Sequence, residues 1–380
     1  MKKVLFAIFI GLMICVNSIF ALQISEVNVN PQMINVGSQN TRISFHIDTD
    51  ANIKIRFYDA DNYIVKEIEK PCFTGTNNVG WDGKDKYENA VPNEAYYFTI
   101  EAKDANGSIF NYDPTDSSGG EDIFVTVPFD FTNGYNVNYS LSKPARVRIR
   151  ANIYRTAVLK NILDWGPRLA VDNSENWDGK DESGLIEAAK LDKLFMKISA
   201  YALPDNSIIT SGNDQSYIEY QNRITQLGGF NSLVERLNSP EGIEASDRAR
   251  SIRANALSRP NVSINEHYML SKSFNYSPDF NIELVSGVVR MEGDTAVVNE
   301  EIAVKVTLDD NSKSMLVNQG FEVSFILDDV ITSEEEEGYS PFTKFIDTKK
   351  FVNGEHILIV NISGLNDYVG ERSIRFKVEN

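Results

Sequence analysis

The sequence has 380 residues, 37 basic and 54 acidic side chains, and a formal net charge of −17. A chain this acidic repels nucleic acid and anionic lipid, so the charge argues against a partner of either kind. Its length allows about three domains of ordinary size, each able to bury a core without cross-links.

The first 21 residues have the pattern of a secretory signal. Lys2 and Lys3 precede an apolar run from Val4 to Val16, and Asn17–Ala21 supplies an exit that ends in a small residue. The run is too short to span a bilayer, and no later stretch is long and apolar enough to do so. We therefore predict cleavage near Leu22 and an extracytoplasmic location: secreted, periplasmic or at the cell surface.

Cleavage changes both the charge and the cysteine content. The exported chain loses two lysines, which leaves 35 basic against 54 acidic residues, a net charge of −19. Cys72 is then the only cysteine, so no disulfide can form within the chain. A lipoprotein signal at Cys15 is the alternative, although Ile14 occupies a position where a small residue is needed.

A five-residue motif, Trp-Asp-Gly-Lys-Asp, occurs at residues 81–85 and again at residues 177–181. Six core-type positions also repeat with one offset of 94, from Ile43 and Val137 to Ile55 and Ile149, which predicts a duplicated β unit. Asp-Gly favours a reversal in which Gly takes a positive φ, and a preceding Trp can close one end of a small core. An exposed Trp that stacks on a sugar ring is the alternative. The predicted structural turn anchors are Trp81, Asp82, Gly83, Asp85, Trp177, Asp178, Gly179 and Asp181.

The surroundings of the first motif carry a family resemblance. Between Arg42 and Ala102 the chain contains two strand-like stretches, the turn Asp59-Ala60-Asp61-Asn62, the motif itself and the run Asn89–Ile100. This arrangement resembles the Ig-like domain of the FlgD family, and the second copy resembles it more loosely. The resemblance implies a small antiparallel β-sandwich, found in flagellar hook-capping proteins and in secreted bacterial proteins, and it brings no catalytic residues. Glu94 departs from the family, which usually has Gly there.

Period-two alternation places strands in two predicted sandwiches, at residues 22–125 and 126–212. In the first, the expected strands are Gln23–Val29, Ile43–Ile47, Asn52–Tyr58 and Tyr96–Ala102. In the second, they are Val137–Leu141, Val147–Ile149 and Phe195–Ala200. The centre of the second unit, residues 165–175, reads as irregular.

Helical spacing replaces this alternation in a predicted linker at residues 213–272. A first helical stretch is interrupted at Gly228-Gly229, and a second is expected from Ile243 to Leu257. The second stretch carries the one basic cluster of the chain. The cluster is expected to be a solvated helix face whose charges keep it soluble, and a docking surface for an acidic partner or for the chain's own acidic domains is the alternative. The cluster consists of Arg248, Arg250, Arg253 and Arg259.

A third sandwich is predicted at residues 273–380. Its expected strands are Asn281–Val285, Glu301–Leu308, Glu322–Leu327, His356–Ile362 and Ser373–Val378. Their spacing is similar to that of bacterial Ig-like modules of secreted glycan-active and adhesive proteins. We expect His356 to start a strand with local hydrogen bonds, and Glu334–Glu337 to form a solvated loop.

No cofactor or metal is predicted. Calcium is weighed because four aspartates fall at the ends of two strands expected to be neighbours, but they match no calcium loop and structural calcium is only an alternative. These aspartates are Asp48, Asp50, Asp59 and Asp61.

The sequence also offers little to an enzyme. The three histidines, at positions 46, 267 and 356, lie in different segments, and no phosphate loop or zinc spacing is present. Paired carboxylates stay open, because a glycosidase needs only two of them in a cleft.

The predicted fold class is therefore mainly β: tandem antiparallel Ig-like β-sandwiches with a short helical segment between the second and the third. The predicted function is that of a noncatalytic structural or interaction protein with a protein or cell-surface partner, its oligomeric state left open. A carbohydrate-binding or adhesive surface protein is the alternative, and a flagellar cap is less favoured. The candidate sugar-stacking aromatics are Tyr58, Tyr63, Tyr96 and Tyr97.

Overall fold

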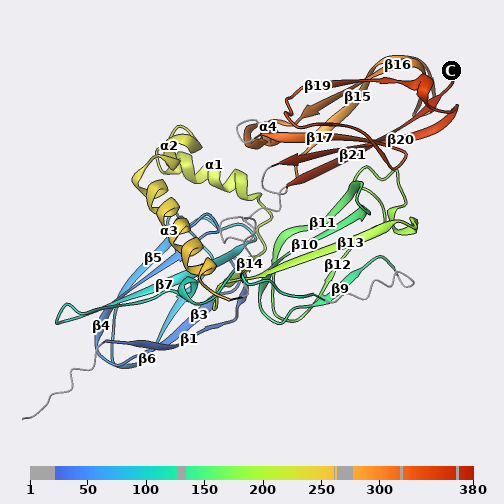
Figure 1. The fold of residues 1–380 in the computed structure, drawn as a ribbon. Helices are drawn as coiled ribbons and strands as arrows, with labels where there is room; N and C mark the ends of the chain where they lie inside the picture. Colours follow the sequence, from blue (N-terminus) through green and yellow to red (C-terminus); the bar gives the residue numbers. More distant parts are fainter. Residues whose placement is uncertain (1–21, 126–133, 261, 263–276, 317–319, 365–367) are drawn as a thin grey trace, which may run out of the picture.

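The computed structural model describes residues 22–125, 134–260, 262, 277–316, 320–364 and 368–380. The predicted signal segment, including Cys15, and also His267 lie outside these ranges. The fold is mainly β, as predicted, with antiparallel sheets in three units and a group of helices (Figure 1). Among the described residues, no helix has the length and apolar character needed to cross a membrane.

The first unit is a sandwich of two sheets. One sheet has the order β1 (Ile24–Asn30), β3 (Thr41–Ile47) and β6 (Gly75–Trp81). The other includes β2 (Met33–Asn35), β4 (Ala51–Tyr58), β5 (Ile64–Cys72), β7 (Ala95–Asp104) and β8 (Ile109–Tyr112). The expectation that β3 and β4 pair is wrong. They lie in opposite sheets, because the alternate apolar residues of both strands face one shared core.

One short strand crosses the predicted boundary between the first two units. β14 (Ile208–Ser211) pairs in parallel with β2 and antiparallel with β7, so it belongs to a sheet of the first unit. The prediction had placed it in the second unit, whose range ends at residue 212. Ile208 and Ile209 are both buried, and such a short apolar run does not indicate which sheet covers it.

The second unit has two smaller sheets. Its strands are β9 (Val137–Ser140), β10 (Ala145–Ile153), β11 (Ala157–Arg168), β12 (Asp172–Glu175) and β13 (Leu194–Ala202). The stretch that reads as irregular is in fact the end of β11 and the whole of β12. Register shifts between β10 and β11, together with a φ of 52° at Trp165, break the alternation that would have indicated a strand.

The repeated core positions have the same environment in both units. Those of the first copy lie on β3 and β4, and those of the second lie on or beside β9 and β10. Every one of them is buried, which explains the shared apolar pattern: Ile43, Phe45, Ile47, Ala51, Ile53, Ile55, Val137, Tyr139, Leu141, Ala145, Val147 and Ile149.

The helical segment packs on the first unit (Figure 1). It consists of α1 (Tyr217–Leu227), α2 (Leu233–Leu237) and α3 (Pro240–Leu257). A serine at the N-cap of each helix accepts a hydrogen bond from the first turn, which fixes where each helix begins. The segment is thus helical as predicted, and it covers an earlier part of the chain.

The third unit is built from seven strands. They are β15 (Phe280–Glu292), β16 (Thr295–Leu308), β17 (Phe321–Leu327), β18 (Val330–Glu335), β19 (Phe342–Asp347), β20 (Gly354–Gly364) and β21 (Val369–Val378), with a short helix α4 (Asp310–Leu316). Glu334 and Glu335 lie in β18, so the predicted acidic loop is partly wrong. An edge strand tolerates charged side chains, so it can lack the apolar alternation from which a strand is predicted.

Candidate functional site

The first Trp-Asp-Gly-Lys-Asp turn closes on itself through three interactions. Trp81 is buried and stacks on Phe57 with ring centroids 4.7 Å apart. Its Nε1 donates to the carbonyl of Lys84 at 2.9 Å, and the Lys84 amide donates to Oδ1 of Asp82 at 3.1 Å. Gly83 has a φ of 74°, a conformation that other residues rarely adopt. The anchor is therefore structural, and its ring is not exposed for a sugar.

The second turn repeats this geometry. Trp177 is also buried, and its Nε1 donates to the carbonyl of Lys180 at 2.8 Å. The Lys180 amide donates to Oδ1 of Asp178 at 2.9 Å, and Gly179 has a φ of 79°. The two turns therefore have the same internal hydrogen bonds.

The last aspartate of the first turn has a second role. Asp85 is 1% exposed, and its Oδ1 accepts hydrogen bonds from the amides of Tyr87 and Asn89 at 2.8 and 2.9 Å. Its Oδ2 accepts from the hydroxyl of Tyr220 on α1 at 3.2 Å. One carboxylate oxygen thus shapes the turn while the other holds the helical segment.

The last aspartate of the second turn divides its oxygens in the same way. Asp181, also 1% exposed, accepts from the amide of Ile186 through Oδ1 at 2.8 Å. Its Oδ2 accepts from the hydroxyl of Ser373 at 2.6 Å, and Ser373 lies on β21 of the third unit. In both copies, this aspartate joins its own turn to an element that comes later in the chain.

Two more carboxylates of the first unit hold α1. Asp59 Oδ2 accepts from Nε2 of Gln221 at 2.9 Å, and Asp61 Oδ2 accepts from the hydroxyl of Tyr217 at 2.9 Å. Burial raises the pKa of Asp59 to about 6, against the opposing effects of the Tyr63 amide and other donors. Burial, and next the nearby charge of Asp59, raise the pKa of Asp61 to about 7.

These contacts bear on the calcium alternative. Asp48 and Asp50 precede β4, whereas Asp59 and Asp61 follow it, so the two pairs lie at opposite ends of one strand. Eight residues of strand span roughly 25 Å, far beyond the reach of one ion. Among the described residues, no group of three or more His, Cys, Asp or Glu side chains could hold a metal ion.

Part of the predicted arginine cluster docks on the chain's own acidic surface. The guanidinium of Arg248 lies over the rings of Tyr58 and Tyr97, 4.2 and 5.1 Å from their centroids. Its Nε donates to the hydroxyl of Tyr97 at 2.7 Å and its Nη2 to Asp113 at 2.8 Å. Arg248 therefore fastens α3 to the first sandwich by stacking and by charge.

The other three arginines divide between this interface and solvent. Arg259 donates to the carbonyl of Gly119, and its Nη1 lies 3.8 Å from a carboxylate oxygen of Glu121. Arg250 and Arg253 are exposed, and Arg250 pairs with Asp247 on its own helix. Docking of the exposed pair on an external acidic partner stays a prediction.

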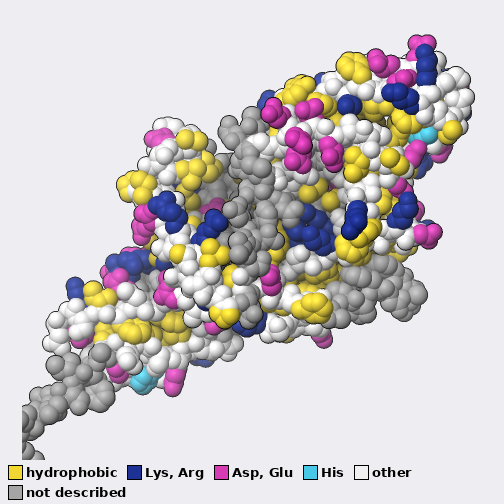
Figure 2. All heavy atoms as spheres, in the orientation of Figure 1, with side chains coloured by type: hydrophobic (Ala, Val, Ile, Leu, Met, Phe, Trp, Pro, Cys, Tyr) yellow, Lys and Arg dark blue, Asp and Glu magenta, His cyan; other side chains and the backbone are white. Residues whose placement is uncertain are grey.

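Arg236 on α2 adds a basic contact that the sequence analysis missed. Its guanidinium lies 4.0 Å from the ring centroid of Tyr63, and its Nη1 donates to Oε1 of Gln221 at 2.6 Å. Its Nε donates to Glu241 at 2.7 Å. Beyond these contacts, Val234 and Leu237 are exposed, and Figure 2 shows apolar side chains over this part of the helical segment.

The helical segment contacts three of the four candidate sugar-stacking tyrosines, Tyr58, Tyr63 and Tyr97, and the fourth, Tyr96, lies in the sandwich core against Trp81. Tyr58, Tyr63, Tyr96 and Tyr97 are all buried, so they cannot form an exposed stacking platform, and this expectation is wrong. Of the exposed aromatic side chains among the described residues, Tyr154 and Phe195 meet edge to face, with an angle of 71° between their planes. A flat sugar-binding platform requires coplanar rings, and this pair does not provide one.

Glu94, the departure from the FlgD pattern, joins the first two units. Its side chain is 5% exposed, and its Oε1 accepts a hydrogen bond from Nη1 of Arg146 on β10 at 2.6 Å. Burial raises the pKa of Glu94, and the charge of Arg146 opposes that rise. A glycine at this position could not form the ion pair, so the substitution ties this sandwich to its neighbour.

The second and third units meet through an apolar cluster and an amide bridge. Trp177 of the second unit lies in one buried cluster with Ile326 and Ile359 of the third. The side chain of Asn361 accepts from the Val158 amide and donates to the Val158 carbonyl, both at 2.9 Å. Asn361 therefore binds the backbone of β11 as a paired strand would.

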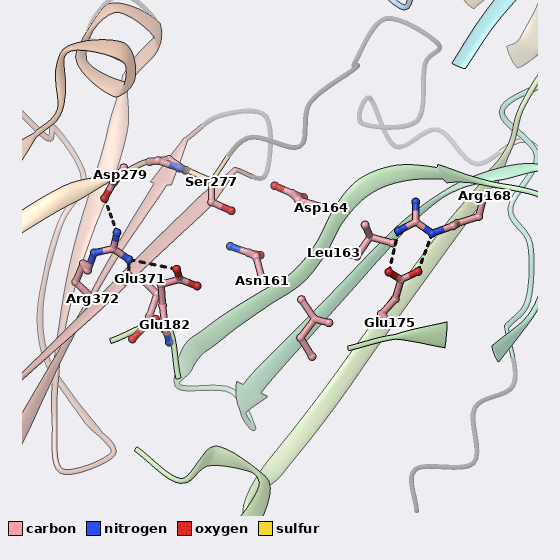
Figure 3. Close-up of a pocket in the computed structure, with 12 residues that line it drawn as sticks. Asn161, Leu163, Asp164, Arg168, Glu175, Glu182, Ser277, Asp279, Glu371 and Arg372 are labelled. Atoms are coloured by element: carbon pink, nitrogen blue, oxygen red, sulfur yellow. Dashed lines mark hydrogen bonds and ion pairs between the residues drawn. The ribbon is translucent and has the colours of Figure 1, made fainter. Parts of the chain in front are cut away.

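A cleft of about 560 Å³ lies between the same two units (Figure 3). Each of its carboxylates already has a partner. Arg168 binds Glu175 at 2.7 Å and Arg372 binds Asp279 at 2.5 Å. The remaining pairs are Asp164 with Arg150, Glu182 with Lys160 and Glu371 with Ser373. The cleft thus holds formed ion pairs and hydrogen bonds, an arrangement that suits an interface between units.

His356 has one hydrogen bond that is local in sequence, as expected, and a second one to a residue 28 positions earlier. Its Nε2 lies 2.8 Å from the carbonyl of Val352, and its Nδ1 lies 2.5 Å from Asp328. Burial lowers the pKa of His356, but these two acceptors outweigh that effect, so its pKa is raised overall. The ring stabilises a loop of the third unit.

Comparisons with known proteins leave the chain without a family. No family model and no curated protein matches it. FlgD from P. aeruginosa is 20% identical over 24% of this chain and 67% of its own, with a TM-score of 0.20. The fibronectin(III)-like modules of Clostridium thermocellum CbhA are 9% identical over 93% and 94%, also with a TM-score of 0.20. The endo-beta-1,4-mannanase from Thermotoga petrophila is 17% identical over 38% of this chain and 25% of its own, with the same TM-score. Similarities this weak carry no argument, so the fold class rests on the strand pairing of the chain itself.

Sequence reasoning located the turns but missed what binds to them. Tyr220 and Ser373 lie 135 and 192 positions from their aspartate partners, and no local pattern connects residues so far apart. One signal was present. Glu94 stands where the resemblance leads one to expect Gly, and a carboxylate that must be buried requires a cation such as Arg146.

Proposed function

We propose that this chain is an exported, noncatalytic scaffold whose Ig-like units, the first two FlgD-like, dock in a fixed array and present binding surfaces to a protein or cell-surface partner. One observation carries the proposal. Each duplicated turn ends in a buried aspartate that uses one oxygen for its own turn and the other for a later element, Tyr220 or Ser373. The repeated motif thus supplies contacts to later segments of the chain as well as the turns within each unit.

Buried polar contacts at the joints support a fixed arrangement. The Glu94–Arg146 pair joins the first two units, Arg248 joins α3 to the first, and Asn361 joins the last two. A buried polar group stabilises a structure only when its partner is held in place, since an unpaired one loses the hydration it had in water. Units that moved freely relative to one another would leave these polar groups exposed to water.

Export is supported by the sequence of residues 1–21. The net negative charge suits a soluble or surface-associated protein, and Figure 2 shows acidic and basic side chains interspersed on the visible face. The noncatalytic part of the proposal is supported by the cleft, where Glu175, Asp279 and Glu182 pair with arginine or lysine and Glu371 is hydrogen-bonded to Ser373.

Small-angle X-ray scattering of residues 22–380 at pH 6 tests the scaffold. The proposal expects a profile fitted by one rigid arrangement. Arg146→Ala should broaden the range of shapes, because it leaves Glu94 buried and unpaired. A parent profile that requires a wide ensemble of arrangements would reject a fixed array.

A reporter fusion tests export. Residues 1–21 fused to a reporter protein should direct that reporter out of the cytoplasm, and retention of the reporter in the cytoplasm would reject export.

A further inference from the structure

A buried cluster of three side chains lies where the third unit meets the second. The hydroxyl oxygen of Ser373 is 2.6 Å from Oδ2 of Asp181 and 2.9 Å from Oε1 of Glu371. Asp181, Glu371 and Ser373 are 1%, 3% and 6% exposed. Two carboxyl groups from different units therefore share one hydroxyl group.

The number of hydrogens in this cluster is too small for two ionised carboxylates. A serine hydroxyl carries one hydrogen, and an ionised carboxylate can only accept. Oδ1 of Asp181 is already bound by the Ile186 amide, and Oε2 of Glu371 by the Glu182 amide at 2.9 Å. The second short contact to Ser373 therefore requires a proton on a carboxyl group. Glu371 can carry it on Oε1 and donate to Ser373, which then donates to Asp181.

The charges around Glu371 favour this proton. Burial, and next the nearby charge of Asp181, raise the pKa of Glu371 to about 8. The cations of the surrounding elements are bound to other carboxylates: Lys160 lies 2.7 Å from Glu182, and Arg372 lies 2.5 Å from Asp279 and 3.7 Å from Glu182. The remaining acids that line the same cleft are Asp164 and Glu175, and they pair with Arg150 and Arg168.

We propose that a proton held between Glu371, Ser373 and Asp181 controls the docking of the third unit on the second. Docked, the interface keeps the proton; undocked, Glu371 meets water and releases it. The docked form binds more protons than the open form between the ordinary pKa of a glutamate, 4.5, and the raised value of about 8. Raising the pH through this window therefore favours opening.

Opening would uncover apolar surface as well as charge. The cluster that contains Trp177 also contains Leu159 of the second unit and Ile326 and Ile359 of the third. These side chains cover one another only while the two units are docked. A rise in pH thus exposes apolar surface on both units. This pH-dependent opening goes beyond the fixed array proposed above.

Amide hydrogen exchange in the full chain, followed by NMR with 15N-serine and 15N-valine, measures this directly. The amides of Ser373 and Val158 donate across the interface, to Ser183 at 2.7 Å and to Asn361 at 2.9 Å. After correction for intrinsic rates, their protection should fall roughly 100-fold from pH 6 to pH 9, because one proton is released on opening. The Val304 amide, in the core of the third unit, should show no such change.

Two variants remove the need for the proton by different chemistry. Glu371→Gln supplies an amide hydrogen to Ser373, and Asp181→Asn lets Ser373 accept one hydrogen and donate its own to Glu371. Glu371→Gln should retain its protection within threefold up to pH 9. Asp181→Asn should lose less protection than the parent does, because burial still raises the pKa of Glu371 once the charge of Asp181 is gone. The matched control Glu322→Gln, an exposed acid on β17, should lose protection as the parent does. The idea is wrong if the parent changes less than threefold, or if both variants lose as much protection as the parent. Strong protection at pH 6 in all of them would leave the scaffold proposal standing in either case.

Discussion

The two Trp-Asp-Gly-Lys-Asp turns have nearly identical internal hydrogen bonds, but they bind different elements of the chain. Their internal hydrogen bonds agree within 0.2 Å, at 2.9 and 2.8 Å for the indole and at 3.1 and 2.9 Å for the aspartate. Outside, Asp85 holds a helix through Tyr220, whereas Asp181 holds a β-strand through Ser373. The same local sequence thus provides a fixed acceptor, and the element that binds it is free to differ.

The neighbourhoods of the two acceptors differ in strength and in kind. The Tyr220 contact is long, at 3.2 Å, and the helices depend on arginine stacking as well, at Arg236 and Arg248. The Ser373 contact is short, at 2.6 Å, and is joined by an apolar cluster around Trp177. The aspartate is therefore one contact among many at the first turn and a central one at the second.

Replacement of the tryptophans should produce the largest effects. Trp81→Ala removes a buried ring from the first core and should destabilise that unit by roughly 3–5 kcal/mol. Trp177→Ala should also loosen the third unit, because its ring lies in the shared cluster. Scanning calorimetry of the full chain, with hydrogen exchange to assign the transitions, distinguishes them. An unchanged first-unit transition in Trp81→Ala would show that ring to be exposed.

Arg248 offers a sharper test of how the helices are held. Arg248→Ala removes stacking on two tyrosines and a bond to Asp113, and should weaken the docking of α3 by about 1.5–3 kcal/mol, as for hydrogen bonds to charged groups. Arg250→Ala, on the same helix but exposed, should change stability by less than about 0.5 kcal/mol. Exchange rates of the α3 amides compare them. Equal effects would mean that the stacked arginine does not hold the helix.

His356 should produce the smallest effect, one that depends on pH. Both ring nitrogens face oxygen acceptors, Asp328 and the Val352 carbonyl, so the charged form satisfies both. Because its pKa is raised, the ring should stabilise the third unit fully below pH 6.5, and this contribution should be lost as the pH rises through the raised pKa. His356→Gln should remove this dependence, worth on the order of 1 kcal/mol. Urea unfolding at pH 6 and pH 9 measures it, and a variant with the parent's pH profile would contradict the assignment.

The sequence revealed local structure far better than contacts between segments. Apolar alternation on β3 and β4, the turns at Gly83 and Gly179, and the helical spacing of α3 are properties of neighbouring residues, so they could be read directly. The pairing of the strands could not be predicted in this way. β14 joins a sheet whose other strands lie more than a hundred residues earlier in the chain. The register shifts between β10 and β11 break the apolar alternation that would have predicted the end of β11. Three of the candidate sugar-stacking tyrosines, Tyr58, Tyr63 and Tyr97, are contacted by a helical segment that is distant in sequence.

The candidate site shows the same limit. The motif predicted the position of Asp85 and Asp181 but gave each of them only the role of a turn former. Their second oxygens matter because Tyr220 and Ser373 reach them after the chain has folded. Glu94 was noticed as a departure, yet its partner Arg146 could be identified only from the structure.

Amide exchange at pH 6 in the matched pair Tyr220→Phe and Ser373→Ala tests the central claim most directly, since each change removes a docking hydroxyl and leaves its turn intact. The account predicts that Tyr220→Phe speeds exchange in α1 alone. It predicts that Ser373→Ala speeds exchange only at the interface between the second and third units, at the amides of Val158 and of residue 373, roughly tenfold, because a buried acceptor loses its donor. Unchanged rates in both variants, or loosening of the same segments by both, would contradict the account.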